Sequence, residues 1–225
     1  MPSLGNYANF LTGIRKAHDR AEEYYRRAVE ADPKNVNHLG NYATFLTDIR
    51  KAHDRAEEYY HRALEAGPEH ASNLGNYAVF LTAIRKDYNR AEEYYRRAIE
   101  LDPSNLNIIA NYSGFLLAQG RKEGLALLEE VLPQLKTWGR ADLPAECWFY
   151  AFAHRPPETR PDALRNLKKA ILNGARSPGW DLSLNISRAR DERHPDVDWL
   201  EKLAAVISNG ADIASLNEWE AWAEA

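Results

Sequence analysis

Four asparagines recur in the first half of this sequence at an interval of 35 residues: Asn6, Asn41, Asn76 and Asn111. A carboxamide can donate one hydrogen bond and accept another at the same time, which matches what a peptide unit offers. Inside a helix asparagine costs about 0.7 kcal/mol relative to alanine, so helix formation alone does not favour it. One such side chain in each repeat could hold the main chain of an extended ligand, whatever side chains that ligand carries.

Two other groups of residues could carry chemistry. Cys147 and His154 lie seven residues apart, the spacing of one helix face, and could act as nucleophile and base. The apolar surroundings of Cys147 are more typical of a packing cysteine. His194, Asp196 and Asp198 could bind a metal, but proline and acidic residues here are also typical of a helix start.

The sequence contains no glycine-rich phosphate loop, no paired-cysteine zinc spacing and no Gly-x-Ser-x-Gly motif. We therefore expect no catalytic site, no metal and no cofactor. An enzyme would need chemistry in the second half of the chain that no motif reveals.

Composition and charge limit the expected binding partners and the expected cellular location. The chain has 225 residues and a net charge of -4, so nonspecific nucleic-acid binding is not expected. The sequence contains no stretch of about 18 consecutive apolar residues, so no membrane-spanning helix is expected. The first residues contain no basic region followed by an apolar run, so no secretory signal is expected. Cys147 is the only cysteine, which fits a reducing compartment. These features together predict a cytoplasmic protein without nucleic-acid or membrane partners.

The asparagines belong to a longer repeat. Residues 4–38 and 39–73 are identical at 25 of 35 positions. Leu-Gly-Asn-Tyr-Ala occurs three times at this interval, and so does Ala-Glu-Glu-Tyr-Tyr. A diverged fourth copy begins near Leu106, where Asn111 and Tyr112 keep the register. The repeats are therefore expected near residues 1–35, 36–70, 71–105 and 106–135.

Each copy is typical of two helices. In the second copy Leu39, Tyr42, Ala43, Leu46 and Ile49 follow helical spacing along one face. A second amphipathic helix is predicted from residue 55 to residue 66. Prolines at 33, 68 and 103 mark where the second helices must end.

The start of each second helix carries an apparent capping box. Asp54 with Glu57 can satisfy free backbone amides at the helix start, and Asp19 with Glu22 repeats the pattern. Asn89 and the glutamate three residues later have the same spacing. Arginine-lysine pairs such as Arg50 and its neighbour are expected at the ends of the first helices, where cations suit the helix dipole. Alternatively, these cations could select an acidic ligand.

A hairpin this short cannot bury its apolar face alone, so neighbouring hairpins are expected to stack into a solenoid. The spacing Leu39-x2-Tyr42-Ala43-x2-Leu46, followed by Ala-x3-Tyr and a closing proline, resembles the tetratricopeptide repeat. The resemblance covers roughly residues 1–135. It implies an all-α, right-handed superhelix whose first helices line a concave groove. The period is 35 rather than the family's 34, with the extra residue expected between Arg50 and Asp54. A bulky Tyr42 also precedes the small residue at 43.

The first helices carry a second stripe of mostly small, uncharged residues at positions i, i+4, i+7 and i+11, which we call the polar strip. In the second repeat it consists of Asn37, Asn41, Thr44 and Asp48. Some tetratricopeptide superhelices carry an asparagine ladder in the groove, and the four asparagines match it. Alternatively, the carboxamides could bond between hairpins and lock the stacking. The residues expected to bind a peptide are Asn6, Asn41, Asn76, Asn111, Asn9, Asn37, Thr44, Ser72 and Asn107.

Residues 136–225 differ in composition, since all six tryptophans lie there, from Trp138 to Trp222. Helices at 143–154 and 161–175 are expected to form a degenerate fifth hairpin. Further helices are expected near 182–190, 195–208 and 213–223. Because repeat arrays need atypical end units, this region is interpreted as a helical cap with Leu216, Trp219 and Trp222 facing inward. An exposed aromatic docking patch is the alternative.

The sequence thus predicts a non-catalytic module that binds a peptide or protein segment in a concave groove. A rival is an assembly protein that forms homo-oligomers through an uncovered first hairpin, since Met1 falls directly on a first-helix position. A regulatory segment of a larger protein is a third possibility. RNA-reading pentatricopeptide repeats also have a 35-residue period, but residues 1–105 carry 15 basic and 16 acidic residues, which argues against them.

Overall fold

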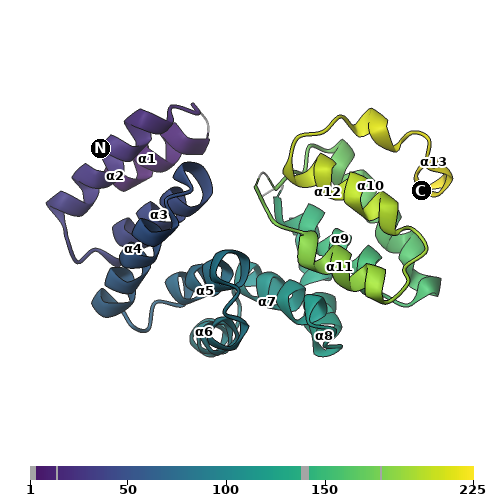
Figure 1. Ribbon diagram of the computed structural model, residues 1–225, viewed down its shortest axis with the longest axis horizontal. Coiled ribbons are helices and arrows are strands. Elements are labelled where there is room, and N and C mark those ends of the chain that lie inside the picture. The colour runs from purple at the N-terminus through teal and green to yellow at the C-terminus, as the bar shows by residue number, and fades with distance from the viewer. Residues whose placement is uncertain (1–3, 14, 138–141, 178) are drawn as a thin grey trace. The chain divides into compact units, whose positions relative to one another are not determined.

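The computed structural model describes residues 4–13, 15–137, 142–177 and 179–225 (Figure 1). Every regular element within these ranges is a helix. None of the described helices is both long enough and apolar enough to span a membrane. Packing divides the chain into two compact units, Met1–Ile108 and Ile109–Ala225. Met1 and Trp138, singled out above, lie outside the described ranges.

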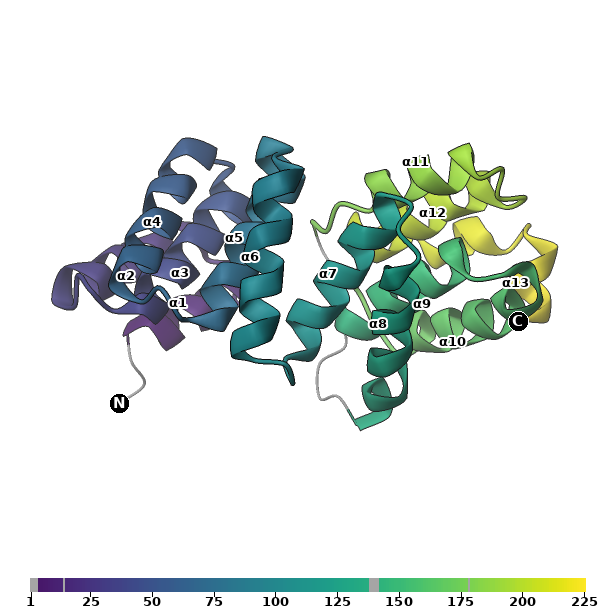
Figure 2. The same ribbon diagram turned by 90° about the horizontal axis from the view of Figure 1, so that it is seen from below.

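The first unit consists of stacked helical hairpins, as the repeats predict. The helices are α1 (Leu4–Gly13), α2 (His18–Ala31), α3 (Val36–Phe45), α4 (His53–Ala66), α5 (Ala71–Phe80), α6 (Tyr88–Leu101) and the beginning of α7 (Leu106–Ala118). α1 packs along α2, α3 along α4 and α5 along α6, and the second helices α2 and α4 also contact the next first helices, α3 and α5 (Figure 2). Neighbouring first helices also touch one another, α1 against α3 and α3 against α5.

The core of these hairpins comes from the predicted apolar stripes. In α3, Leu39, Tyr42, Ala43 and Leu46 beyond its end are at most 1% exposed. Each second helix buries two alanines and the second tyrosine of its Tyr-Tyr pair, such as Tyr60 in α4. Because the apolar residues occupy one side of each first helix, the polar strip lies on a different side of that helix.

The predicted capping boxes are wrong. The residues before α2 and α4 are alanines without a side-chain cap, and α6 is capped by Asp87, which accepts from the amide of Arg90. The acidic residues of the first two hairpins instead face the next hairpin. A carboxylate forms a charge-assisted hydrogen bond with either partner, but a guanidinium adds a full positive charge and several N–H donors, which favours this long-range pairing.

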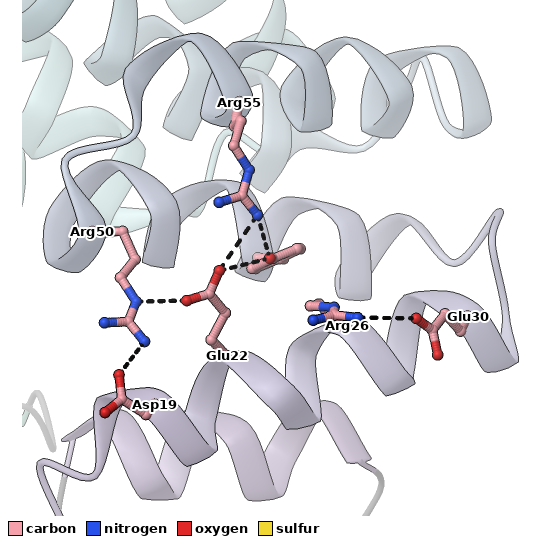
Figure 3. A network of polar contacts seen from close by, with 7 residues as sticks. Asp19, Glu22, Arg26, Glu30, Arg50 and Arg55 are labelled. Carbon is pink, nitrogen blue, oxygen red and sulfur yellow. Dashed lines mark hydrogen bonds and ion pairs between the residues drawn. The ribbon is translucent and has the colours of Figure 1, made fainter.

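Arg50 joins the first two hairpins (Figure 3). Its guanidinium donates to Glu22 at 2.6 Å and to Asp19 at 2.7 Å. Glu22 also accepts from the buried Tyr42 hydroxyl at 3.2 Å, and Arg55 donates to that hydroxyl at 2.9 Å. The hydrogen bonds to the shared carboxylate tie one hairpin to the next more specifically than apolar contact does.

The same network recurs one repeat later. Arg85 donates to Glu57 at 2.8 Å and to Asp54 at 2.6 Å, and Tyr77 donates to Glu57 at 3.1 Å. Arg50 and Arg85 therefore bind acidic residues of the hairpin before them, a role that the helix-dipole interpretation does not include.

The residue that lengthens the repeat to 35 lies earlier than predicted. The chain forms π-helical turns at Leu46–Arg50 and Leu81–Arg85, directly after α3 and α5. A π turn accommodates one residue more than an α turn. Lys51 then adopts a left-handed conformation with φ 54°. In the fourth hairpin α7 ends without a π turn, and Gly120 takes the left-handed position with φ 72°.

A recurring glycine lets neighbouring first helices approach closely. A Cβ atom on Gly40 of α3 would lie 2.0 Å from Oδ1 of Asn73 in α5. Asn73 is 4% exposed, and its Nδ2 donates to the carbonyl oxygen of Val36 at 3.0 Å. Gly5 receives His38 in the same way, and a Cβ there would lie 2.9 Å from the imidazole. The glycine of Leu-Gly-Asn-Tyr-Ala therefore receives a side chain of the following hairpin.

The second unit is helical throughout its described residues. After α7 come α8 (Glu123–Val131), α9 (Asp142–His154), α10 (Arg160–Leu172), α11 (Ser183–Asp191), α12 (Val197–Ser208) and α13 (Glu220–Glu224). α9 packs along α10, as the predicted fifth hairpin requires. The boundary between residues 135 and 136 stays a prediction.

The last predicted helix is broken. Residues 213–216 form a short 3₁₀ turn, Trp219 is extended, and α13 follows. Leu216, Trp219 and Trp222 are 0–4% exposed, so they face inward as predicted rather than forming a docking patch. Trp199 stacks on Trp219 with ring centroids 5.2 Å apart, and Lys168 of α10 donates to the carbonyl oxygen of Trp222 at 2.6 Å.

Candidate functional site

The polar strip reaches solvent in the first unit. Asn6 in α1 is exposed, and Asn41 in α3 and Asn76 in α5 are half-buried. These residues occupy equivalent positions on first helices that pack against one another. The three side chains are therefore presented by one row of helices, one from each hairpin.

The carboxamides of Asn41 and Asn76 do not lock the hairpins together in the way the alternative interpretation requires. Within the described part of the chain, the side chains of Asn41 and Asn76 make no hydrogen bond, although each keeps access to solvent. The inter-hairpin amide bond is made by a different asparagine, Asn73, which donates to Val36. Both capacities of the two carboxamides, donor and acceptor, are thus available to a ligand.

Two further residues of the polar strip, Asn9 and Thr44, contact the hydroxyl groups of buried tyrosines. Tyr25 donates to Oδ1 of Asn9 at 2.6 Å, and the Tyr60 hydroxyl lies 3.3 Å from Oγ1 of Thr44. Burial desolvates these phenols and raises the pKa of Tyr60 to about 12. The tyrosine hydroxyls therefore stay protonated and orient Asn9 and Thr44, which leaves those two residues less free to bind a ligand.

The remaining predicted site residues differ in exposure. Asn37 and Ser72 are exposed, and Asn107 is half-buried near the start of α7. Asn111 belongs to the second unit and is half-buried there. One turn further along α7, a Cβ on Gly114 would lie 2.6 Å from the Tyr150 ring of α9. The strip is therefore covered at Gly114.

One charge lies on the strip of the second hairpin. Asp48 keeps exposed surface, yet desolvation by surrounding atoms raises the pKa of its carboxyl group above the usual value, and Lys51 opposes that shift. A ligand with a cationic or hydrogen-bond-donating group at this point would relieve the cost of the partly desolvated carboxylate.

Cys147 and His154 do not form a nucleophile and base pair. Cys147 is fully buried, and desolvation raises the pKa of its thiol well above the ordinary value. His154 lies 2.8 Å from Oδ1 of Asn185 through its Nε2, and desolvation lowers its pKa to about 4. Both groups are neutral near pH 7, and neither a thiolate nor an activated pair is present.

The possible metal residues are also accounted for structurally. His194 is buried, its Nε2 lies 3.2 Å from the carbonyl oxygen of Phe152, and its Nδ1 accepts from the amide of Asp196 at 3.1 Å. Among the described residues no group of three or more His, Cys, Asp or Glu side chains is placed to hold a metal ion.

Sequence reasoning missed the residues that join one hairpin of the first unit to the next. The pairs Asp19–Arg50 and Glu22–Arg50 have offsets of 31 and 28 residues, and both recur one repeat later at Arg85. Recurrence of opposite charges at constant offsets could have indicated the pairing. The contact between Asn73 and Gly40 has no comparable signal in the sequence, because a recurring glycine does not show which side chain packs against it.

Comparison with known proteins supports the fold. A model of the tetratricopeptide repeat matches residues 15–35 and 74–105. A structure from the functional characterization of Pseudomonas aeruginosa pilF is 18% identical, with a TM-score of 0.58 over 98% of this chain and 94% of that chain. The crystal structure of YrrB, described as a TPR protein with an unusual peptide-binding site, is 18% identical over 88% of this chain and 90% of that chain, with a TM-score of 0.44. No curated protein matches the chain significantly.

Proposed function

Because this chain is a tetratricopeptide-repeat protein, we propose that it binds an extended segment of another protein along the polar strip and catalyses no reaction. Protein or peptide binding is the general role of modules with this repeat. The observation that carries the specific proposal is the pair Asn41 and Asn76. Both carboxamides reach solvent from adjacent first helices, and neither is used by the described fold.

The mechanism is recognition of main chain. Each carboxamide can donate to a carbonyl oxygen and accept from an amide of the same extended segment. Asn6 supplies the equivalent group on the first hairpin. Small neighbours such as Ser72 and Thr44 allow a backbone to approach closely. Selectivity would then come from the extended shape and from the charge of Asp48.

The test is the double variant Asn41→Ala with Asn76→Ala. Peptides are first selected against the wild-type chain from a random library and then titrated by calorimetry. Each lost neutral hydrogen bond contributes about 0.5–1.5 kcal/mol, so we expect the dissociation constant to rise roughly tenfold to a hundredfold. Asn89→Ala is the matched control, since Asn89 is exposed on a second helix, and it should bind as the wild type does.

Stability separates this proposal from a structural role of the asparagines. Alanine is the better helix former, so the double variant should be as stable as the wild type or slightly more stable in urea unfolding. A variant that unfolds at much lower urea and still binds the selected peptides normally would identify Asn41 and Asn76 as structural residues and remove the proposal.

A second candidate function is self-association through the first hairpin. Tyr7, Arg15 and Arg20 occupy the positions at which Tyr42, Arg50 and Arg55 contact carboxylates of the hairpin before them. A second copy that presents carboxylates there would complete the same network. Light scattering should then show a mass that rises with concentration, and Arg15→Glu with Arg20→Glu should reduce it. A mass of 25.7 kDa throughout the series would exclude this candidate.

A further inference from the structure

A pocket of about 330 Å³ lies between the second helices of the first two hairpins. α2 contributes Arg26 and Glu30, α4 contributes Arg55, Tyr59 and Arg62, and Tyr42 of α3 also lines it. Figure 3 shows Arg26, Glu30 and Arg55 around this region. None of the asparagines assigned to peptide binding lines the pocket, so it is separate from the polar strip.

The pocket carries more positive than negative charge. Arg26 pairs with Glu30 only loosely, at 4.0 Å, with both side chains more than 60% exposed. Arg62 lies over the Tyr59 ring, 4.7 Å from its centroid, and forms no ion pair within the described part of the chain. Three guanidinium groups thus line the pocket with Glu30 as the one acidic lining residue.

Arg55 is positioned by the network that joins the hairpins. It donates to the Tyr42 hydroxyl at 2.9 Å and lies 3.4 Å from Glu22. Glu22 accepts its shorter bond, at 2.6 Å, from Arg50. The carboxylate is therefore shared, and the remaining N–H groups of Arg55 can serve another acceptor.

We propose that this pocket binds an oxyanion, a carboxylate or a phosphate group, carried by a side chain of a partner protein. Guanidinium groups bind such oxyanions with paired, charge-assisted hydrogen bonds. Tyr59, which is half-buried, offers aromatic surface to the carbon atoms beside the anionic group. The proposal does not depend on peptide binding along the polar strip.

The next junction between hairpins provides an internal comparison. His61 occupies the position of Arg26, its Nε2 lies 3.3 Å from the Tyr77 hydroxyl, and the two rings are in contact. Arg97 occupies the position of Arg62, and its guanidinium donates to the carbonyl oxygen of Pro68 at 3.5 Å. Arg26 is one of the ten positions at which the first two repeats differ. The arginine set is thus specific to the first junction.

The experiment uses the full chain and three probes: inorganic phosphate, a hexaglutamate peptide and a hexaglutamine peptide. Binding is followed by the NMR signals of the arginine Nε–H groups. We expect phosphate, hexaglutamate or both to shift the signals of Arg26, Arg55 and Arg62, and hexaglutamine to shift none of them. Response to phosphate alone identifies phosphate as the preferred group, and response to hexaglutamate alone identifies carboxylate.

Two variants locate the site. Arg62→Gln removes the unpaired cation, and Arg26→His introduces the residue of the second junction. Each is expected to weaken binding of the responding probe about tenfold, whereas Arg97→Gln should leave it unchanged. Circular dichroism confirms that the variants fold. The proposal is overturned if neither anionic probe binds, or if Arg62→Gln and Arg26→His bind as the wild type does.

Discussion

Gly40→Ala is expected to lower the free energy of unfolding by about 2–4 kcal/mol. The new Cβ would lie 2.0 Å from Oδ1 of Asn73, which is buried and bonded to Val36. Overpacking costs about 1–3 kcal/mol, and breaking the buried hydrogen bond costs a similar amount. The better helix propensity of alanine offsets about 1 kcal/mol of this loss in the free energy of unfolding. Urea unfolding followed by circular dichroism measures the change.

Two variants show whether the close approach causes this loss. Gly13→Ala adds a methyl group at a helical glycine where, in the described part of the chain, no contacting atom lies within 4 Å of the added carbon, so it should not destabilise the chain. In a background of Asn73→Ala, the cost of Gly40→Ala should largely disappear, because the contacting carboxamide is gone. An equal loss in both backgrounds would show that the contact between α3 and α5 is not the cause.

Acidification is expected to destabilise the second unit by about 3 kcal/mol between pH 6.5 and pH 4. Desolvation lowers the pKa of His154 from 6.5 to about 4 in the folded chain. In this pH window the unfolded chain binds more protons than the folded chain, so stability is present above pH 6.5 and is lost as the pH falls. Each pKa unit corresponds to about 1.4 kcal/mol.

His154→Gln tests this dependence, because glutamine can still donate to Oδ1 of Asn185 and does not titrate. Urea unfolding between pH 4 and pH 7 should show a weaker pH dependence for the variant. Part of the slope will remain, since desolvation also lowers the pKa of His194. An NMR titration that finds His154 protonating near pH 6.5 in the folded chain would contradict the prediction.

The repeat period and the helix faces could be read from the sequence because both depend on local spacing. Buried residues such as Leu39, Tyr42 and Tyr60 lie on the predicted stripes. Each second helix ends two residues before the proline that predicted its end, at Ala31, Ala66 and Leu101. The strip positions followed from the same periodicity, since the opposite face of an amphipathic first helix must meet solvent or a partner.

The errors arose where a local partner and a distant partner compete for the same side chain. Asp54 has the spacing of a helix cap, yet it pairs with Arg85, 31 residues away. The last helix has suitable helical spacing from 213 to 223, yet it breaks so that Trp219 can lie between Trp199 and Trp222. The spacing of residues in the sequence is compatible with both the local and the distant contact, and it does not show which of the two is more stable.

The sequence by itself determined that the first half of this chain is built from 35-residue helical hairpins and which side chains share a helix face. Helix geometry fixes both through contacts three and four residues apart. The stacked structure decided which acidic residue pairs with Arg50, what fills the space beside Gly40, and which carboxamides remain open to solvent. These outcomes depend on the register of one hairpin against the next, which is set by many simultaneous packing contacts between residues distant in the chain.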